Sequence, residues 1–313
     1  MERKAYFTLE NSLFYRSLFF NFLITVPILT LWSAEFNFMY ILIVIFFGIG
    51  FSTKSTWFKV IISSTIACFR AFSSGGFDHP TAFFALLLIY TFVTFLSAAV
   101  TNQYIIQKRN ETELIMTLSK LLDSRDKYTA NHSENVASYS LKIAKKMGLS
   151  KYQCKAIYIG GLLHDTGKIG VPESVLIKPA KLTANEYEII KTHPVIGYET
   201  LKPISFIREL GVLEMILYHH ERFDGKGYPF GLKGEEIPLP ARIMAIADSF
   251  DAMTSSRVYR DGLGIDYALT EIEINKGKQF DPEIAEVFLR IMNQEKYSLG
   301  QEVIQSAKKI IKF

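Results

Sequence analysis

Charged residues are distributed very unevenly along this chain of 313 residues, and the distribution limits how it can fold. Residues 1–107 contain ten Asp, Glu, Lys and Arg side chains, whereas the remaining 206 residues contain 56. Ten charges are too few to cover a soluble domain of this size, because roughly a quarter to a third of a soluble surface is charged. The sequence therefore predicts an apolar N-terminal region followed by a soluble domain of about 200 residues, long enough to bury a core.

Four apolar stretches account for the N-terminal region. They are Leu13–Trp32, Phe36–Phe51, Trp57–Phe72 and Ala82–Tyr104. A helix needs roughly 17–25 residues to span a bilayer, so the first and last are long enough and the middle two are marginal without their flanks. We predict a transmembrane region over residues 1–107 with about four spans. A buried apolar helical domain is the alternative.

Basic residues flank these stretches in a pattern that predicts their orientation. Pairs of basic residues precede the first stretch, separate the second from the third and follow the fourth: Arg3 and Lys4, Lys54 and Lys59, Lys108 and Arg109. The other two loops carry Glu35 and Asp78. Because positive residues favour the cytoplasmic side, four spans with both ends inside satisfy all three pairs. The soluble domain is then expected in the cytoplasm, attached to a multi-pass membrane region.

Residues 101–127 are predicted to form one helix that leaves the membrane, with residues 108–127 connecting the two parts. Its apolar residues repeat at helical spacing: Ile105, Ile106, Leu114, Ile115, Leu118, Leu121 and Leu122. Such a stripe could pair with a second copy of the chain in a parallel homodimer. It could equally pack on its own domain, and the pattern does not separate these alternatives.

The small net charge of the chain excludes one class of partner. The net charge is +4, whereas a dedicated DNA-binding domain is strongly basic. The two cysteines, Cys68 and Cys154, lie in different regions and suggest no disulfide framework or zinc-ribbon spacing. A reducing compartment is therefore expected for the soluble domain.

Histidines are concentrated in the soluble part, where five of the six lie between residues 132 and 220. They are His132, His164, His193, His219 and His220, and Asp165 and Asp248 also lie in apolar surroundings. Imidazole and carboxylate ligands without a thiolate suit iron, manganese, zinc or nickel. Seven such groups are too many for one ion with open positions. They suit two ions that share a carboxylate and act together in phosphoryl displacement.

These candidate ligands are far apart in the sequence, so separate segments must fold together to bring them into contact. No alternating apolar run of convincing strand length occurs between residues 110 and 313. The soluble domain is therefore predicted to be mainly α-helical. With a helical membrane region before it, the whole chain is expected to be all-α.

Four motifs in the soluble part contain most of these residues. They are HDTGKIGVPESVL at 164–176, HPVIGYE at 193–199, HHERFDGKGYP at 219–229 and ADSFDAMTSSRVYR at 247–260. These motifs resemble those of the HD-GYP family of bacterial cyclic di-GMP phosphodiesterases. The resemblance covers roughly residues 112–292, and the HHE…DGKGYP block with His193 distinguishes this family from the wider HD phosphohydrolases. It implies an all-helical HD-type bundle over residues 112–313, with an extension that carries the GYP loop.

The resemblance also implies a role for each matching residue. One metal ion would be held by His132, His164, Asp165 and Asp248, and a second by Asp165, His193, His219 and His220, with Asp165 as the bridge. Asp165 and Lys168 would be catalytic, since Lys168 matches the residue that contacts the scissile phosphate. Substrate binding would involve Lys168, Asp251, Arg257, Arg260 and Tyr228. The two arginines match positions that hold the second phosphate, to which a guanidinium donates paired hydrogen bonds.

The GYP loop comprises Gly225, Gly227, Tyr228 and Pro229. The loop would border the pocket, where Tyr228 could meet a base or a partner protein. Glu221 is expected to help order this loop or the nearby ligands, as carboxylates behind a metal site often do.

Three positions depart from the family pattern. Phe223 replaces the usual Trp, Val258 replaces the usual Pro, and Tyr128 stands where members with a third metal have Glu. Phe223 and Val258 keep their positions apolar, and Tyr128 favours the type of family member that binds two metal ions. Because no ligand position is lost, the resemblance implies an enzyme rather than a domain that only binds.

The resemblance thus implies a metal-dependent phosphodiesterase anchored in the bacterial inner membrane. It would hydrolyse cyclic di-GMP to pGpG, and in a second round to GMP, with two divalent ions: iron or manganese, with zinc or nickel as alternatives. Another cyclic dinucleotide such as 3′,3′-cGAMP is an alternative substrate, because the motifs contact metals and phosphates rather than bases. A receptor that binds the nucleotide or a partner protein without hydrolysis is a further alternative. A transport role lacks support, since no acidic residue lies well inside the four stretches.

Overall fold

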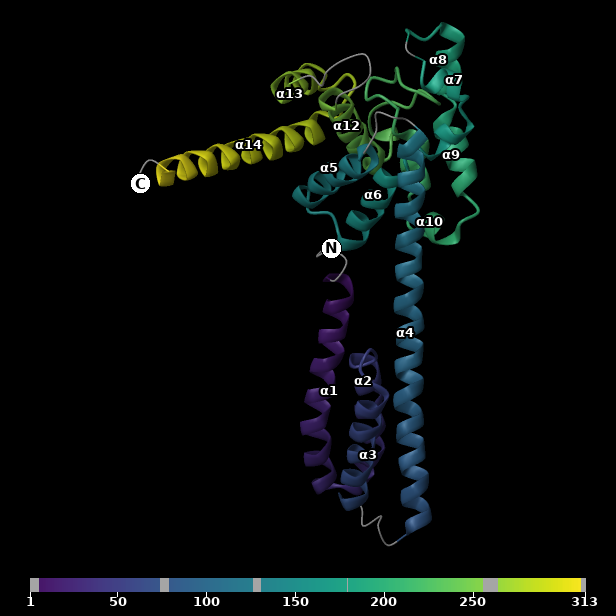
Figure 1. The fold of residues 1–313 in the computed structure, drawn as a ribbon, viewed down its shortest axis with the longest axis vertical. Helices are drawn as coiled ribbons and strands as arrows, with labels where there is room; N and C mark the ends of the chain where they lie inside the picture. Colours follow the sequence, from purple (N-terminus) through teal and green to yellow (C-terminus); the bar gives the residue numbers. More distant parts are fainter. Residues whose placement is uncertain (1–5, 74–78, 126–130, 179, 256–263, 311–313) are drawn as a thin grey trace. The chain divides into compact units, whose positions relative to one another are not determined.

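The computed structural model describes residues 6–73, 79–125, 131–178, 180–255 and 264–310. Throughout these ranges the chain forms α-helices and short 3₁₀ helices, with isolated β-bridges and no β-strand (Figure 1). The prediction of an all-helical fold is therefore confirmed for the described residues. The chain divides into two compact units, Met1–Thr112 and Glu113–Phe313, each with a hydrophobic core of its own.

The N-terminal unit is built from apolar helices. Its elements are α1 (Tyr6–Trp32), the 3₁₀ helix η2 (Ala34–Met39), α2 (Tyr40–Gly50), α3 (Thr56–Ser73) and the first part of α4 (Pro80–Arg125). Both α2 and α3 contact α4, through Gly48 beside Thr94 and through the hydroxyls of Ser63 and Thr91, which lie 3.4 Å apart. Large apolar side chains fill the space between the helices, among them Phe19, Val26, Ile43, Phe47 and Tyr90.

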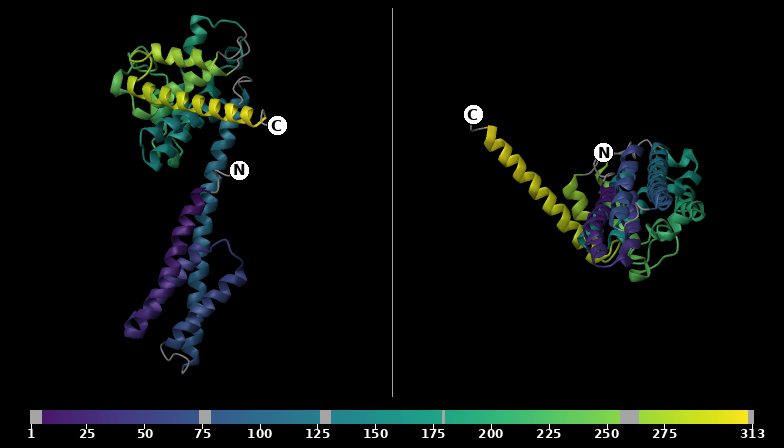
Figure 2. Two further views of the ribbon diagram at one scale, coloured as in Figure 1. Left: turned by 90° about the vertical axis from the view of Figure 1, so that its left-hand side faces the viewer. Right: turned by 90° about the horizontal axis from the view of Figure 1, so that it is seen from below.

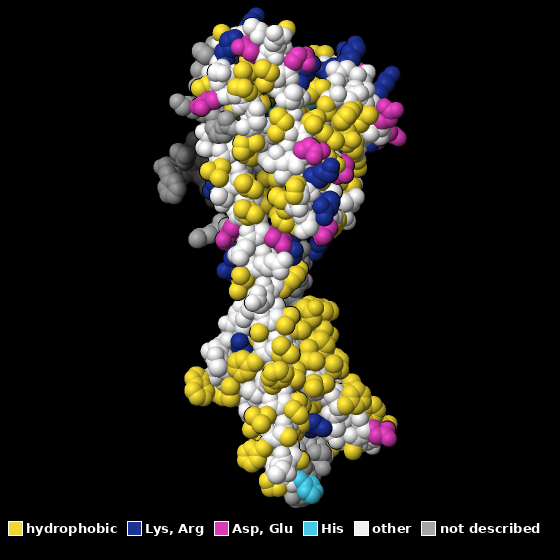
Figure 3. All heavy atoms as spheres, turned by 90° about the vertical axis from the view of Figure 1, so that its right-hand side faces the viewer, with side chains coloured by type: hydrophobic (Ala, Val, Ile, Leu, Met, Phe, Trp, Pro, Cys, Tyr) yellow, Lys and Arg dark blue, Asp and Glu magenta, His cyan; other side chains and the backbone are white. Residues whose placement is uncertain are grey.

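Large apolar side chains also cover much of the outer surface of this unit (Figure 3). Trp32 is 90% exposed, and Leu31 and Phe72 are 82% and 79% exposed. Soluble monomers rarely expose contiguous apolar surfaces of this kind, and such surfaces mark contact with lipid or with another protein.

By length and composition, two helical segments of the described chain could cross a membrane, Ser12–Trp32 and Pro80–Ser124. The helix α2 has 11 residues, fewer than the roughly 17–25 that a span requires. The segment Ala34–Gly50 that contains it is apolar but shorter than a full span. The structure thus contains two spanning candidates, and the number of four stays a prediction.

The helix α4 contains 46 residues, begins in the apolar unit and ends in the second unit. One continuous helix therefore covers residues 101–125 of the connector, and residues 126 and 127 lie outside the described ranges. Ile115 is buried in the core of the second unit, and Leu118 packs against that core. Leu114 and Leu121 are 49% and 59% exposed. One side of the connector packs on its own domain, and the other side lies on the surface.

The second unit is a bundle of short helices. The elements after α4 are α5 (His132–Lys146), α6 (Lys151–Leu163), η4 (Thr166–Gly170), α7 (Glu173–Leu176), α8 (Ala184–Ile190), α9 (His193–Leu201), α10 (Ser205–Glu209), α11 (Leu213–Tyr218), η5 (Gly234–Glu236), α12 (Leu239–Thr254), α13 (Ile265–Ile274) and α14 (Pro282–Ile310). Figure 2 shows the C-terminal part of α14 extending beyond its neighbours α12 and α13. Capping boxes begin α6 (Ser150 with Gln153) and α8 (Thr183 with Glu186), where each satisfies free backbone N–H groups.

At the centre of this unit, α5 packs closely against both α6 and α12. Gly161 of α6 lies against the backbone of α5, where an added Cβ would come within 2.5 Å of the Ala137 Cα. Tyr139, Phe250 and Phe288 pack edge to face between α5, α12 and α14. The approach of α6 to α5 therefore depends on the absence of a side chain at Gly161.

We expect Gly161→Val to destabilise the second unit. The branched side chain would meet the backbone of Ala137, which cannot rotate away, and overpacking of this kind costs about 1–3 kcal/mol. Thermal unfolding of the purified chain measures the loss. Lys145→Ala, on an exposed position of α5, is the control and should change stability by less than about 0.5 kcal/mol. Equal stability of the two variants would contradict the packing described above.

Candidate metal centre

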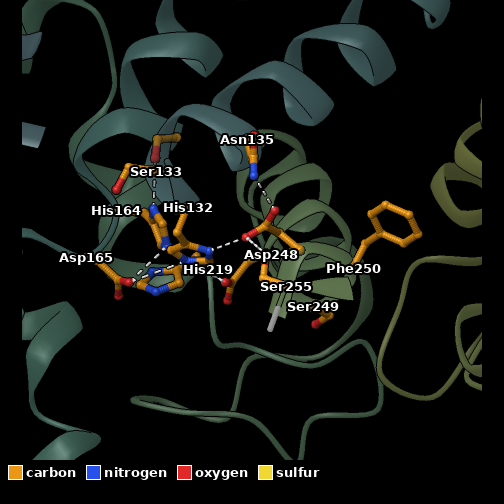
Figure 4. Close-up of polar contacts among 12 residues, drawn as sticks. His132, Ser133, Asn135, His164, Asp165, His219, Asp248, Ser249, Phe250 and Ser255 are labelled. Carbon is orange, nitrogen blue, oxygen red and sulfur yellow. Dashed lines mark hydrogen bonds and ion pairs between the residues drawn. The ribbon is translucent and has the colours of Figure 1, made fainter. Parts of the chain in front are cut away.

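The chemically reactive residues of the second unit come from separate helices and converge at one place (Figure 4). His132 begins α5 and His193 begins α9, whereas His164 and His219 directly follow α6 and α11. Asp248 lies in α12. His132, His164 and His219 point toward one another in Figure 4, together with Asp165 and Asp248. The folded chain therefore joins residues that are up to 116 positions apart in the sequence.

Ligand atoms of His132, His164 and Asp165 form one cluster, in which they all lie within 4.8 Å of one another. The Nε2 atom of His164 is 3.4 Å from Oδ2 of Asp165. The Nε2 atom of His132 is 3.3 Å from Oδ1 of Asp248, which adds a second carboxylate. This cluster offers two imidazoles and two carboxylates, a donor set suited to a divalent metal ion.

His193, His219 and His220 form a second cluster, whose ligand atoms also lie within 4.8 Å of one another. The Nε2 atom of His193 is 3.4 Å from Oδ1 of Asp165. The two oxygens of Asp165 therefore face different clusters, Oδ2 toward His164 and Oδ1 toward His193. This is the arrangement expected of a carboxylate that bridges two ions.

Hydrogen bonds on the far side of each ring orient the imidazoles. The Nδ1 atoms of His164, His193 and His219 lie 2.8, 2.8 and 2.7 Å from backbone carbonyl oxygens three residues earlier in the chain. A carbonyl can only accept, so each Nδ1 donates and each Nε2 presents a lone pair to the centre. Metal-binding histidines are commonly held in this way.

Two observations indicate that a cation fits between these lone pairs. The Nε2 atoms of His193 and His219 are 3.2 Å apart, although both Nδ1 atoms are already donors. Among the described residues, the buried Nε2 of His164 has no hydrogen-bond partner. Nitrogen ligands about 2.0–2.1 Å from an ion lie roughly 3 Å apart. An ion in the second cluster would therefore separate the facing lone pairs, and an ion in the first would give His164 a partner.

The charges at the centre shift the pKa values of its residues in opposite directions. Burial alone would raise the pKa of Asp165, but Lys168 and three histidines hold it well below its usual value. Burial would lower the pKa of His132, but hydrogen bonds to Asp248 and Asp251 raise it to about 10. Burial lowers the pKa of His220 to about 3 and lowers those of His193 and His219 as well. The second cluster is therefore held neutral, as metal ligation requires.

Lys168 lies beside the carboxylate that joins the two clusters. Its Nζ is 2.6 Å from Oδ2 of Asp165, and the side chain is partly exposed. The short η4 helix that carries it presses against α9 through Gly167, where an added Cβ would overlap the carbonyl oxygen of His193. Gly167 therefore allows Lys168 and His193 to approach the same centre.

The GYP loop is tied to the centre by Glu221, which is 3% exposed. Its carboxylate accepts hydrogen bonds from the backbone N–H groups of Phe230, Gly231 and Leu232, at 2.8, 3.1 and 3.1 Å. The Tyr228 ring stacks on His220 with centroids 4.7 Å apart, and its burial raises the pKa of its hydroxyl. Glu221 therefore fixes the backbone of residues 230–232, which directly follow the GYP loop.

Other predicted site residues are differently placed. Arg257 and Arg260 lie outside the described residues, as do Tyr128 and Val258. Asp251 differs from its expected position on the substrate side, since it is 2% exposed and its Oδ2 lies 2.7 Å from Nδ1 of His132. Its carboxylate is turned into the protein because donors on α5 surround it.

Sequence reasoning missed two contacts around His132. The Oγ of Ser133 donates to Oδ1 of Asp123 at 2.6 Å, which joins the end of α4 to the start of α5. Asn135 donates to Oδ1 of Asp251 at 2.8 Å. The available signal was position alone, since Asn135 lies one turn after His132 and faces the same side of α5.

We expect the metal-free protein to lose stability as the pH falls from about 7 to about 5. The lowered pKa values of His193, His219 and His220 mean that the unfolded chain binds protons below about 6.5 that the folded chain does not. His132 acts in the opposite direction, because its contribution is complete below 6.5 and is lost as the pH rises toward about 10. Three histidines thus lower the stability on acidification and one raises it. Melting temperatures of the chelator-treated protein, measured from about pH 7 to about pH 5, give the net effect.

His220→Asn tests this interpretation, because it removes one of the three groups that bind a proton only in the unfolded chain. The decrease in melting temperature on acidification should be smaller in this variant than in the parent protein. A melting temperature that rises as the pH falls from about 7 to about 5 would contradict the assignment of charges.

Comparison with known proteins gives the same result as the motifs. Residues 116–284 match the family model described as an HD domain. A cyclic di-GMP phosphodiesterase of Thermotoga maritima is 45% identical over 57% of this chain and 49% of its own length. The cyclic di-GMP phosphodiesterase response regulator RpfG of Xanthomonas campestris is 41% identical over 64% of this chain and 53% of its own. A 3′3′-cGAMP-specific phosphodiesterase of Vibrio cholerae is 34% identical over 65% of this chain and 39% of its own.

The chain thus spans about half the length, or less, of these curated relatives. The matched region contains both clusters and the GYP loop. The chain therefore belongs to the HD-domain family and carries the motifs of its HD-GYP group.

Proposed function

We propose that this chain is a membrane-anchored, metal-dependent phosphodiesterase that hydrolyses cyclic di-GMP to pGpG and, in a second round, to GMP. One observation carries the proposal: the two oxygens of Asp165 face two separate groups of imidazoles, 3.4 Å away in each case. A pair of ions about 3.5–4 Å apart is suited to in-line displacement at phosphorus. The names of the relatives support a cyclic dinucleotide as the substrate class.

In this proposal each cluster holds one divalent ion. His132, His164 and Asp248 hold the first, His193, His219 and His220 hold the second, and Asp165 bridges them. When bound, the ions supply Lewis acidity toward the scissile phosphate and lower the pKa of the attacking water. The imidazole and carboxylate donor set suits iron, manganese, zinc or nickel. The resemblance to the HD-GYP family favours iron or manganese among these four. Anaerobic purification with metal quantification identifies the ions.

Side chains around the centre bind and orient the substrate. Lys168 provides an ammonium group next to Asp165, where it would stabilise the charge that develops on the phosphoryl oxygens. Tyr228 lies against His220 and offers an aromatic face to a guanine base. Arg257 and Arg260 hold the second phosphate. Together these side chains would hold the cyclic dinucleotide in one orientation at the centre.

We expect Asp165→Asn to lose the ability to hold two ions together. The amide keeps the size of the side chain but removes the charge that attracts both cations. Hydrolysis of cyclic di-GMP should fall by more than the factor of about 10–100 typical for residues behind a metal ligand. Metal content and turnover of the purified protein are measured together.

Asp266→Asn is the matched control, since it removes one charge from an exposed position on α13. It should retain both ions and full turnover. Wild-type turnover in Asp165→Asn would refute the enzyme assignment. An inactive parent protein that still binds cyclic di-GMP would favour the receptor alternative.

A second candidate substrate is 3′,3′-cGAMP. The observation in its favour is that relatives 34% and 37% identical to this chain are named as phosphodiesterases specific for it. The contacts that the structure describes concern metals and phosphates, which the two substrates share. Hydrolysis rates for cyclic di-GMP, 3′,3′-cGAMP and cyclic di-AMP, measured side by side with the same preparation, separate the candidates.

The proposed anchoring follows the sequence-based division of the chain. Residues 1–107 form about four spans, residues 108–127 the connecting helix, and residues 112–313 the catalytic domain in the cytoplasm of a bacterial cell. The exposed Leu114 and Leu121 on α4 support a homodimer through the connecting helix. A partner protein at the GYP loop is a further proposal, supported by Phe230, which is 62% exposed.

We expect topology reporters to detect four spans. Alkaline phosphatase, which is active only outside the cytoplasm, should be active when fused within residues 74–78 and inactive when fused after Lys54. A green fluorescent protein fusion, which is fluorescent only in the cytoplasm, should show the opposite pattern. The reason is that the loop with the basic residues Lys54 and Lys59 is expected inside. Activity of the phosphatase at Lys54 would exclude the four-span arrangement.

A further inference from the structure

We propose that Asp251 is a positioning residue that holds the imidazole of His132 toward the first metal position and makes that position bind its ion more tightly. The proposal rests on the metal centre described under the proposed function. It concerns one pair of side chains, Asp251 on α12 and His132 at the start of α5.

Helix α12 contacts both nitrogens of the same ring. Asp248 places Oδ1 at 3.3 Å from Nε2 of His132, and Asp251, three residues later, places Oδ2 at 2.7 Å from Nδ1. Residues three apart lie on the same side of a helix, so one face of α12 supplies both carboxylates. The ring cannot turn without losing one of these contacts.

The carboxylate of Asp251 is itself fixed. Its Oδ1 accepts a hydrogen bond from Asn135 at 2.8 Å, and its Oδ2 accepts one from the Oγ of Ser255 at 3.1 Å in addition to that from His132. The residue is 2% exposed. Three hydrogen-bond donors contact the two carboxylate oxygens, so Asp251 has almost no exposed surface that a substrate could contact. Asp251 therefore acts on the centre through His132.

The partner of the His132 Nδ1 differs in kind from those of His164, His193 and His219. His164, His193 and His219 donate their Nδ1–H to neutral backbone carbonyls. His132 donates to a buried carboxylate, and hydrogen bonds to an ionised acceptor are about twice as strong as neutral ones. A carboxylate behind a histidine raises the basicity of the nitrogen that binds the metal. Asp251 therefore strengthens ion binding at the first position and has no such effect at the second.

The test is a titration of the metal-free, full-length protein with Mn²⁺ in competition with a chelator. Asp251→Asn keeps the shape and the acceptor oxygen but removes the charge. It should weaken one of the two binding steps by about 10–100-fold and leave the other unchanged. The spin-coupled electron paramagnetic resonance signal of a manganese pair should appear at correspondingly higher Mn²⁺ concentration.

Two further variants complete the experiment. Asn135→Ala leaves the carboxylate in place and removes one of its donors, so it should weaken the same step by a smaller factor. Asp266→Asn, which removes a charge from an exposed residue, should bind both ions as the parent does. Metal-free thermal unfolding reports whether each variant is folded, and Asn135→Ala decides the outcome if Asp251→Asn is not.

The outcomes separate this inference from the proposed function. A parent protein that binds fewer than two ions overturns both. If the parent binds two ions and folded Asp251→Asn binds both as tightly as the parent does, the positioning role alone is overturned. If Asp251→Asn is not folded, the same result for Asn135→Ala overturns it. Equal weakening of both steps overturns it as well, because a residue that merely supports the fold would act on the two positions together.

Discussion

The second unit depends on one buried carboxylate that must remain charged. Asp165 is 8% exposed, and burial without compensation would favour its neutral form. Lys168 and the surrounding imidazoles reverse this preference. Removing one partner would leave a buried charge uncompensated, which is costly in a low-dielectric interior. The helices that carry these groups therefore meet around a charged centre as well as around an apolar core.

Helix ends solve the problem of orienting several imidazoles at once. The last carbonyls of a helix lack partners within it, and His164, His193 and His219 each donate to such a carbonyl, at the ends of α6, α8 and α11. Every ring satisfies a backbone group and faces the centre with its other nitrogen. The glycines at 161 and 167 allow the backbones to approach closely enough for these short bonds to converge. Backbone structure and metal chemistry thus share the same hydrogen bonds.

The helical fold and the convergence of the ligands could be inferred from the sequence because each ligand stands beside a recognisable apolar run or turn. Asp248, for example, directly follows a run of Ile, Met and Ala at residues 243–247. The role of Asp251 could not be inferred, since an acid three residues after a ligand could face either the cleft or the protein interior. Only the placement of Asn135 and Ser255 decides between them. The number of spans also stays open, because α2 alone is too short to cross a bilayer.

The histidines at helix ends limit where residues can be inserted into the chain or deleted from it. Inserting one residue into the last turn of α6 would rotate His164 by about 100° around the axis and advance it by about 1.5 Å. The ring would then point away from Asp165, and Gly161 would no longer supply its carbonyl. The final turns of α6, α8 and α11 therefore admit neither insertions nor deletions, because each of them sets the direction in which one imidazole points.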